Sequence, residues 1–137
     1  MIKLYSGTPG SGKSLHLAKD IYTDLNRRYD RLVICNFDIN TELVKYPERF
    51  HYVDNADLTP QAVIKLAREH FSDRPIKEND VCLYIDECQV IFNARTWNEV
   101  GRKEWLSFFT QHRKYGRIGK NLLNMLSINL TQLVTHT

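Results

Sequence analysis

The sequence predicts an α/β fold with a mostly parallel sheet in three layers, and three observations lead to this class. Two continuous apolar runs, Leu32–Cys35 and Val81–Ile85, are typical of strands buried on both faces. Apolar residues recur at helical spacing from Lys13 to about Arg28, and again after Thr59-Pro60. Strands that alternate with helices in this way indicate a parallel sheet covered by helices.

The composition fits one globular domain spanning residues 1–137. Hydrophobic residues make up 42% and charged residues 26%, which excludes a disordered tail or a collagen-like fibre. The net charge of +3 permits a nucleic-acid partner without requiring one. No apolar run reaches the roughly 18 residues of a membrane-spanning helix. Three cysteines without a CxxC pair argue against a disulfide framework or a zinc site and favour a reducing, cytoplasmic location.

The remaining elements follow from local signals along the chain. Ile2–Ser6 is short, partly β-branched or aromatic, and ends at a glycine, so we expect a strand that leads into a tight loop. Thr59 is suited to cap a helix that starts with Pro60. Aromatic and apolar residues predict a third helix from Gly101 to about Lys114. About fifteen residues of mixed polarity after Cys35, with Pro47 among them, are expected to be connecting structure.

The segment GTPGSGKS fits the phosphate-binding pattern G-x-x-x-x-G-K-[ST]. Its glycines let successive backbone N–H groups turn inward, and the helix that begins near Lys13 adds its positive end. The Lys13 ammonium is expected to act in catalysis at the β and γ phosphates, and the Ser14 hydroxyl to ligate Mg²⁺. The residues predicted to bind the nucleotide are Gly7, Thr8, Pro9, Gly10, Ser11, Gly12, Lys13, Ser14 and Leu15.

A second chemical signal is the acidic pair that ends the Val81–Ile85 run. Acidic residues at the carboxyl end of a buried parallel strand lie at the same sheet edge as the phosphate loop. We expect Asp86 to hold Mg²⁺ through water and Glu87 to act as the catalytic base that polarises the attacking water. The alternative is that Asp86 caps a helix start and that Glu87 is a solvated loop residue. The expected ligands are therefore ATP and Mg²⁺.

Three stretches together resemble the N-terminal ATPase domain of the zonular occludens toxin-like family, which includes the morphogenesis ATPases of filamentous phages. They are GTPGSGKS, YIDECQVIFNAR and FFTQHRKYG. The resemblance covers about residues 1–116, and the second and third stretches are much more specific than the first. The matching residues beyond the loop are Asp86, Glu87, Gln89, Phe92, Arg95, His112, Arg113 and Gly116.

The resemblance implies a P-loop NTPase in which an added strand separates the phosphate-loop strand from the acidic strand. It also implies a role in extruding single-stranded phage DNA, with phage assembly proteins as partners and a homo-oligomer as a further expectation. Longer members of the family are anchored in the inner membrane with this domain on the cytoplasmic side. The membrane link would use family parts that are absent from this chain.

After Gly116 the sequence departs from the family pattern, and we interpret the chain as C-terminally truncated or altered. The run Ile128–Gln132 is a candidate for the delayed strand, with Gln132 as a γ-phosphate sensor. We predict that part of Leu122–Leu133 pairs between Ile2–Ser6 and Val81–Ile85; otherwise the isolated chain would be unstable or would pair with another copy. Because the sensor position is altered, we expect weak ATPase activity.

Two other functions remain open from the sequence. One is a small P-loop kinase, although no arginine-rich lid is evident unless a short one lies between Asn36 and Leu58. The other is a nucleotide-binding assembly module without useful hydrolysis. Several side chains also have two interpretations. The basic residues after the third helix suit contacts with DNA phosphates, action on a neighbour's nucleotide, or a solvated face at a helix end. Arg95 suits an arginine finger or a surface ion pair. The aromatic residues suit base stacking or, more often, a core; they are Trp97, Trp105, Phe108 and Phe109. The basic residues are Arg113, Lys114, Arg117 and Lys120.

Overall fold

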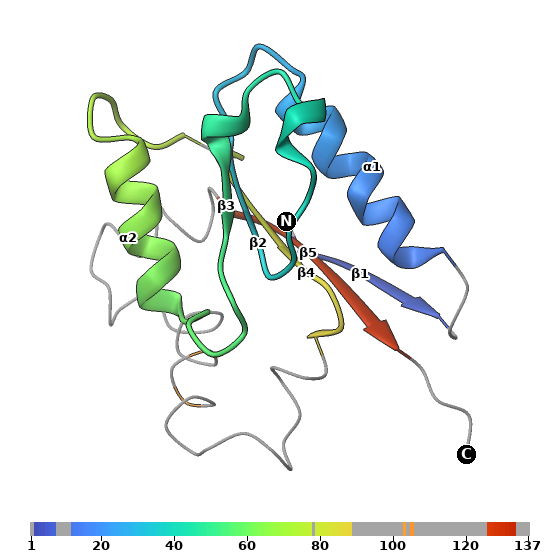
Figure 1. Ribbon diagram of the computed structural model, residues 1–137. Coiled ribbons are helices and arrows are strands. Elements are labelled where there is room, and N and C mark those ends of the chain that lie inside the picture. Colours follow the sequence, from blue (N-terminus) through green and yellow to red (C-terminus); the bar gives the residue numbers. More distant parts are fainter. Residues whose placement is uncertain are drawn as a thin grey trace.

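The computed structural model describes residues 2–7, 12–77, 79–88, 103, 105 and 126–133 (Figure 1). Within these ranges the predicted strands near residues 2–6, 32–35 and 81–85 are present, as are the predicted helices that start at Lys13 and Pro60. The elements are β1 (Ile2–Gly7), α1 (Lys13–Leu25), β2 (Leu32–Cys35), η1 (Thr41–Leu43), η2 (Pro47–Arg49), β3 (Phe50–Tyr52), α2 (Pro60–His70), β4 (Val81–Ile85) and β5 (Leu126–Leu133). No helix in these ranges is both long and apolar enough to cross a membrane.

The sheet has five strands in the order β1-β5-β4-β2-β3, and every neighbouring pair is parallel. β5 lies between the phosphate-loop strand and the acidic strand: Ile128 is opposite Ile2 on one side and Leu83 on the other. This confirms the predicted place of the delayed strand. Because β5 supplies hydrogen bonds to both neighbours, neither β1 nor β4 is left with an unpaired inner edge.

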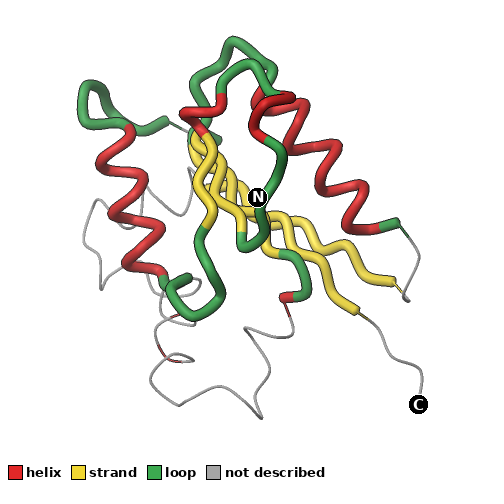
Figure 2. The backbone as a smooth tube through the Cα atoms, viewed as in Figure 1, coloured by secondary structure: helices red, strands yellow, loops and turns green. Residues whose placement is uncertain are grey.

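The two long helices cover opposite faces of the sheet, which makes three layers (Figures 1 and 2). Alternate residues of one strand serve the two faces, since successive side chains in a strand point to opposite sides. Leu32 and Ile34 of β2 pack in the cluster that contains α2, whereas Val33 packs with α1. Two-sided burial explains why β2 and β4 are continuous apolar runs rather than alternating ones.

The helix boundaries follow the capping signals. The Thr59 side chain accepts a hydrogen bond from the Ala62 N–H at 3.2 Å, and Pro60 occupies the first helical position, as predicted. α1 ends at Leu25, about one turn before the predicted Arg28. β3 was not predicted, because its three residues are half-buried or exposed and so form no apolar run.

The predicted third helix falls mostly outside the described residues. Lys103 and Trp105 are described, and both are helical. Trp105 is 3% exposed and packs in the cluster with α2 and β4, which confirms its interpretation as a core residue. The predicted end of that helix at Gly116 lies outside the described residues.

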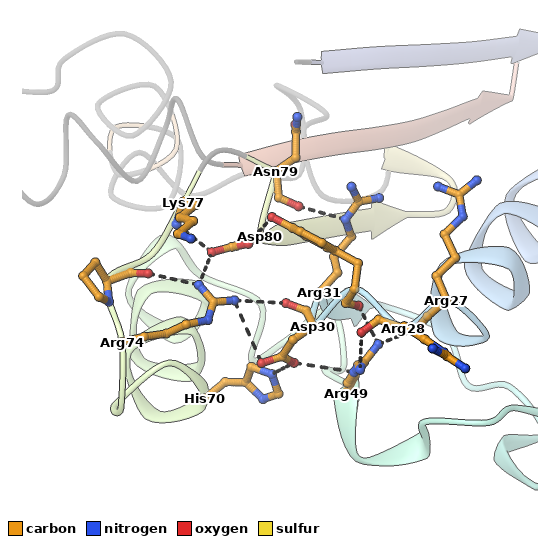
Figure 3. Close-up of polar contacts among 12 residues, drawn as sticks. Arg27, Arg28, Asp30, Arg31, Arg49, His70, Arg74, Lys77, Asn79 and Asp80 are labelled. Carbon is orange, nitrogen blue, oxygen red and sulfur yellow. Dashed lines mark hydrogen bonds and ion pairs between the residues drawn. The ribbon is translucent and has the colours of Figure 1, made fainter.

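At the amino edge of the sheet a charged network fixes the loops (Figure 3). Asp80 is fully buried and accepts hydrogen bonds from Arg74 Nη1 (2.7 Å), the Tyr29 hydroxyl (2.7 Å) and the Lys77 N–H (2.6 Å). Burial raises the pKa of Asp80, but these donors outweigh it and hold the pKa below its usual value. A buried carboxylate with this many hydrogen-bond donors has a structural role. The predicted site lies at the opposite, carboxyl edge of the sheet.

Candidate functional site

The two predicted chemical segments meet at the carboxyl edge of the sheet. β1 ends at Gly7 and β4 ends at Ile85, and both strands run in the same direction beside β5. In parallel α/β sheets this edge is the usual place for a ligand, because the loops after the strands gather there. The topology thus brings the phosphate loop and the acidic pair to one location.

Gly12 forms the junction between the loop and α1. It caps the helix in the left-handed conformation, with φ of 81°, and its carbonyl accepts the His16 N–H at 3.0 Å. Side chains rarely adopt this backbone conformation, although there is open space where a Cβ would stand. The left-handed backbone, rather than a lack of space, is therefore the reason for a glycine at this position.

The described part of the phosphate loop places its charged residue at the start of α1. Lys13 is the first helical residue and is half-buried, and Leu15 exposes 76% of its surface. An apolar side chain exposed to this extent does not serve the core. The predicted ligand-binding residues Thr8, Pro9, Gly10 and Ser11 lie outside the described residues.

Ser14 and Asp86 are in direct contact across the site. The Ser14 hydroxyl lies 3.1 Å from both carboxylate oxygens of Asp86, and 72 positions separate the two residues in the sequence. The hydroxyl donates to the carboxylate, so one residue from the phosphate loop and one from the acidic strand form a single polar unit. The two predicted metal ligands are therefore brought together.

The chemistry of this pair fits Mg²⁺. Hydroxyl and carboxylate oxygens are the hard ligands that Mg²⁺ prefers. The two groups lie 3.1 Å apart, so both could serve one ion. Ser14 and Asp86 would hold the ion, either directly or, for Asp86, through a water.

Asn36 is a site residue that the sequence reasoning missed. It directly follows β2, and its side chain bonds to both the N–H and the carbonyl of Asp86. The signal was available: like Asp86, Asn36 is a polar residue placed immediately after a buried parallel strand. What the sequence did not show is that the two residues, 50 positions apart, would meet.

Glu87 directly follows Asp86 in the chain, and its side chain is exposed. Its backbone is in the left-handed region, with φ of 51°, and its N–H donates to Asp86 Oδ1 at 3.1 Å. Positive φ is uncommon for a non-glycine residue and is often found at functional sites.

Burial, together with the nearby Asp86 carboxylate, raises the pKa of the next residue, Cys88, and so favours its neutral thiol.

A buried hydrogen bond ties the two halves of the site together behind the ligand edge. The Tyr84 hydroxyl of β4 donates to Asp24 of α1 at 2.6 Å, and Arg31 bonds to the other oxygen of Asp24 at 2.9 Å. Burial and the nearby acidic groups raise the pKa of Tyr84, so it remains a donor. α1 begins with Lys13 and Ser14, and β4 leads to Asp86, so this contact fixes their relative position.

The proposed sensor residue is placed in the sheet by its backbone. Gln132 of β5 is in register with Ser6 of β1, one residue before that strand ends. It therefore lies near the ligand edge. The other residues with open interpretations, Arg95 and the basic cluster from Arg113 to Lys120, lie outside the described residues.

A parallel three-layer α/β fold, with a phosphate-loop motif after its first strand and an acidic pair after a central one, has the plan of a P-loop domain. The family model described as zonular occludens toxin (Zot) matches residues 1–118 of the 137. The chain belongs to the zonular occludens toxin family. No curated protein sequence gives a significant match to it.

Proposed function

We propose that this P-loop domain binds ATP with Mg²⁺ at the carboxyl edge of the sheet and hydrolyses the γ-phosphate. The observation that supports this best is the contact between Ser14 and Asp86, since it joins the two oxygen ligands that a Mg²⁺–nucleotide site needs. Membership of the zonular occludens toxin family supports the same assignment.

Each residue then has a defined part in the reaction. Lys13 places a positive charge at the β and γ phosphates, and the amide groups at the start of α1 add the helix dipole. Glu87 accepts a proton from the water whose oxygen attacks the γ-phosphorus, while the bond to the β–γ bridging oxygen breaks and ADP leaves. Mg²⁺, when bound, would neutralise charge on the phosphate oxygens. Ser14 and Asp86 would orient it.

The biological role that we propose is that of a motor domain for phage assembly, which drives the export of single-stranded DNA. The support is the family membership together with the specific stretches around Asp86 and His112. The proposed partners are single-stranded phage DNA, phage assembly proteins and further copies of this chain. We place the domain on the cytoplasmic side of the inner membrane.

The contacts of Arg49 at the amino edge of the sheet argue against the kinase alternative. The only arginine between Asn36 and Leu58 is Arg49, and a phosphate-facing lid in this segment would depend on it. Arg49 is 7% exposed and donates instead to the backbone carbonyls of residues 27–29. It precedes β3 and so lies at the amino edge, away from the phosphate loop.

ATP turnover, measured with Mg²⁺ and with or without single-stranded DNA, tests the proposal. A DNA-export motor hydrolyses ATP slowly alone and faster when DNA is added. A kinase needs a second small substrate for turnover, and an assembly module binds ATP without turnover under either condition. Absence of ATP binding would refute the site itself.

A further inference from the structure

We propose that Asn36 is a positioning residue: its side-chain amide holds the backbone of Asp86 and thereby aims the Asp86 carboxylate at the metal position. This inference rests on the proposed function for the identity of the ion. The contact itself does not depend on that function, because it joins two residues of this chain through hydrogen bonds that involve no ligand atom.

The need for such a residue follows from where β4 ends. Main-chain pairing between β2 and β4 ends with the Asn36 N–H, which donates to the Tyr84 carbonyl at 3.3 Å. Asp86 lies just beyond Ile85, the last residue of β4, so it is not part of the regular ladder. A metal ligand directly after a strand end needs another contact to fix its orientation.

The Asn36 side chain supplies this contact with a matching pair of hydrogen bonds. Its Oδ1 accepts the Asp86 N–H at 2.8 Å, and its Nδ2 donates to the Asp86 carbonyl at 2.9 Å. The amide of an asparagine has the same donor and acceptor as a peptide group. The side chain therefore continues the ladder for one more residue after the main chains have separated.

Asn36 is itself well anchored, which makes it a rigid support. The carbonyl of the preceding residue, Cys35, accepts the Val53 N–H at 2.8 Å, so β2 is held from the β3 side as well. The Asn36 Nδ2 also donates to Asn55 Oδ1 at 2.9 Å, in the exposed loop after β3. Removing a hydrogen bond that orients a metal ligand commonly changes metal affinity or activity by about 10–100-fold.

Asn36→Ala and Asn55→Ala form a matched pair of variants. The first removes both bonds to Asp86. The second removes only the bond between the two asparagines and leaves the support of Asp86 in place. Thermal unfolding of both proteins establishes that they are folded before the other measurements.

The first measurement is hydrogen exchange at the Asp86 amide in the full chain without nucleotide. In the parent protein we expect a protected amide, and in Asn36→Ala an amide that exchanges at least about tenfold faster, while Asn55→Ala resembles the parent. A parent amide as unprotected as a free loop amide would overturn the proposal, and so would unchanged exchange in Asn36→Ala.

The second measurement is the Mg²⁺ concentration that half-maximally enhances binding of a fluorescent ATP analogue. We expect Asn36→Ala to need about 10–100-fold more Mg²⁺, with unchanged analogue affinity in EDTA and a parental value for Asn55→Ala. If analogue binding by the parent depends on Mg²⁺ and Asn36→Ala needs the same Mg²⁺ concentration, the positioning role is wrong while the proposed function stands. If the parent shows no Mg²⁺ dependence, the proposed function fails, and the role of Asn36 toward Mg²⁺ fails with it.

Discussion

The Ser14 hydroxyl and the Asp86 carboxylate lie 3.1 Å apart, although they come from the start of α1 and from the end of β4. This contact joins the two sequence motifs into one site. It exists because β5 separates β1 from β4 while both strands keep the same direction. The fold thus places a hydroxyl from the phosphate loop beside a carboxylate from the acidic strand.

Lys13→Ala should weaken ATP binding by about 10–100-fold, since a hydrogen bond to a charged group contributes about 1.5–3 kcal/mol. The fold should persist, because Lys13 is the first residue of α1 and is not part of its buried face. Isothermal titration with ATP and Mg²⁺ measures the loss. Lys19→Ala, an exposed lysine later in the same helix, is the control and should bind like the parent. Equal affinity in Lys13→Ala and the parent would refute the phosphate-loop assignment.

Glu87→Gln should retain ATP binding and lower the hydrolysis rate by about 10²–10⁴-fold, because it removes the base and preserves the shape. Steady-state phosphate release, together with ATP affinity, separates the two effects. Glu48→Gln, a substitution of an exposed residue near the amino edge, should hydrolyse at the parental rate. Parental turnover in Glu87→Gln would make Glu87 a bystander and would favour a different base.

Asp80→Asn tests the charged network at the amino edge through the pH dependence of stability. The folded pKa of Asp80 is lowered by Arg74, the Lys77 N–H and Tyr29 against the effect of burial. Its charge therefore stabilises the fold above the unfolded-state pKa of about 3.9, and this contribution is lost as the pH falls through the folded pKa. We expect Asp80→Asn to lower the free energy of unfolding by about 1.5–3 kcal/mol at neutral pH.

The measurement is urea unfolding of Asp80→Asn and the parent from pH 7 down to pH 3. The difference between them should shrink below about pH 4. Asp73→Asn, at an exposed aspartate in the same loop region, should change little at any pH. A difference that stays constant down to pH 3 would contradict the assigned pKa direction.

Much of the fold could be predicted because its strongest signals are local. β2 and β4 are apolar runs buried on both faces, and Thr59-Pro60 gives a clear helix start. β5 was placed by the strand order that the family resemblance implies, since its local pattern is weak. In that order, two buried strand edges would be unpaired without it. β3 was missed because three residues at the sheet edge carry no periodicity.

The candidate site was predictable as far as its motifs extend. Ser14 and Asp86 were named from the phosphate-loop pattern and from an acidic residue at a strand end, and the structure brings them together. Asn36 was not found, because its contact with Asp86 depends on how β2 and β4 align, and no local pattern encodes that register. The same holds for Tyr84 and Asp24, which meet across 60 positions.

The most direct test of the account is a double-mutant cycle for Mg²⁺-dependent ATP affinity, using Ser14→Ala, Asp86→Asn and the double variant. If the two side chains hold one ion, each single variant should lose most of the Mg²⁺ enhancement and the double variant little more. That result corresponds to a coupling energy within about 0.5–3 kcal/mol, and affinities in EDTA should remain alike. Additive losses, or a parent protein whose ATP affinity is the same with and without Mg²⁺, would contradict the central claim.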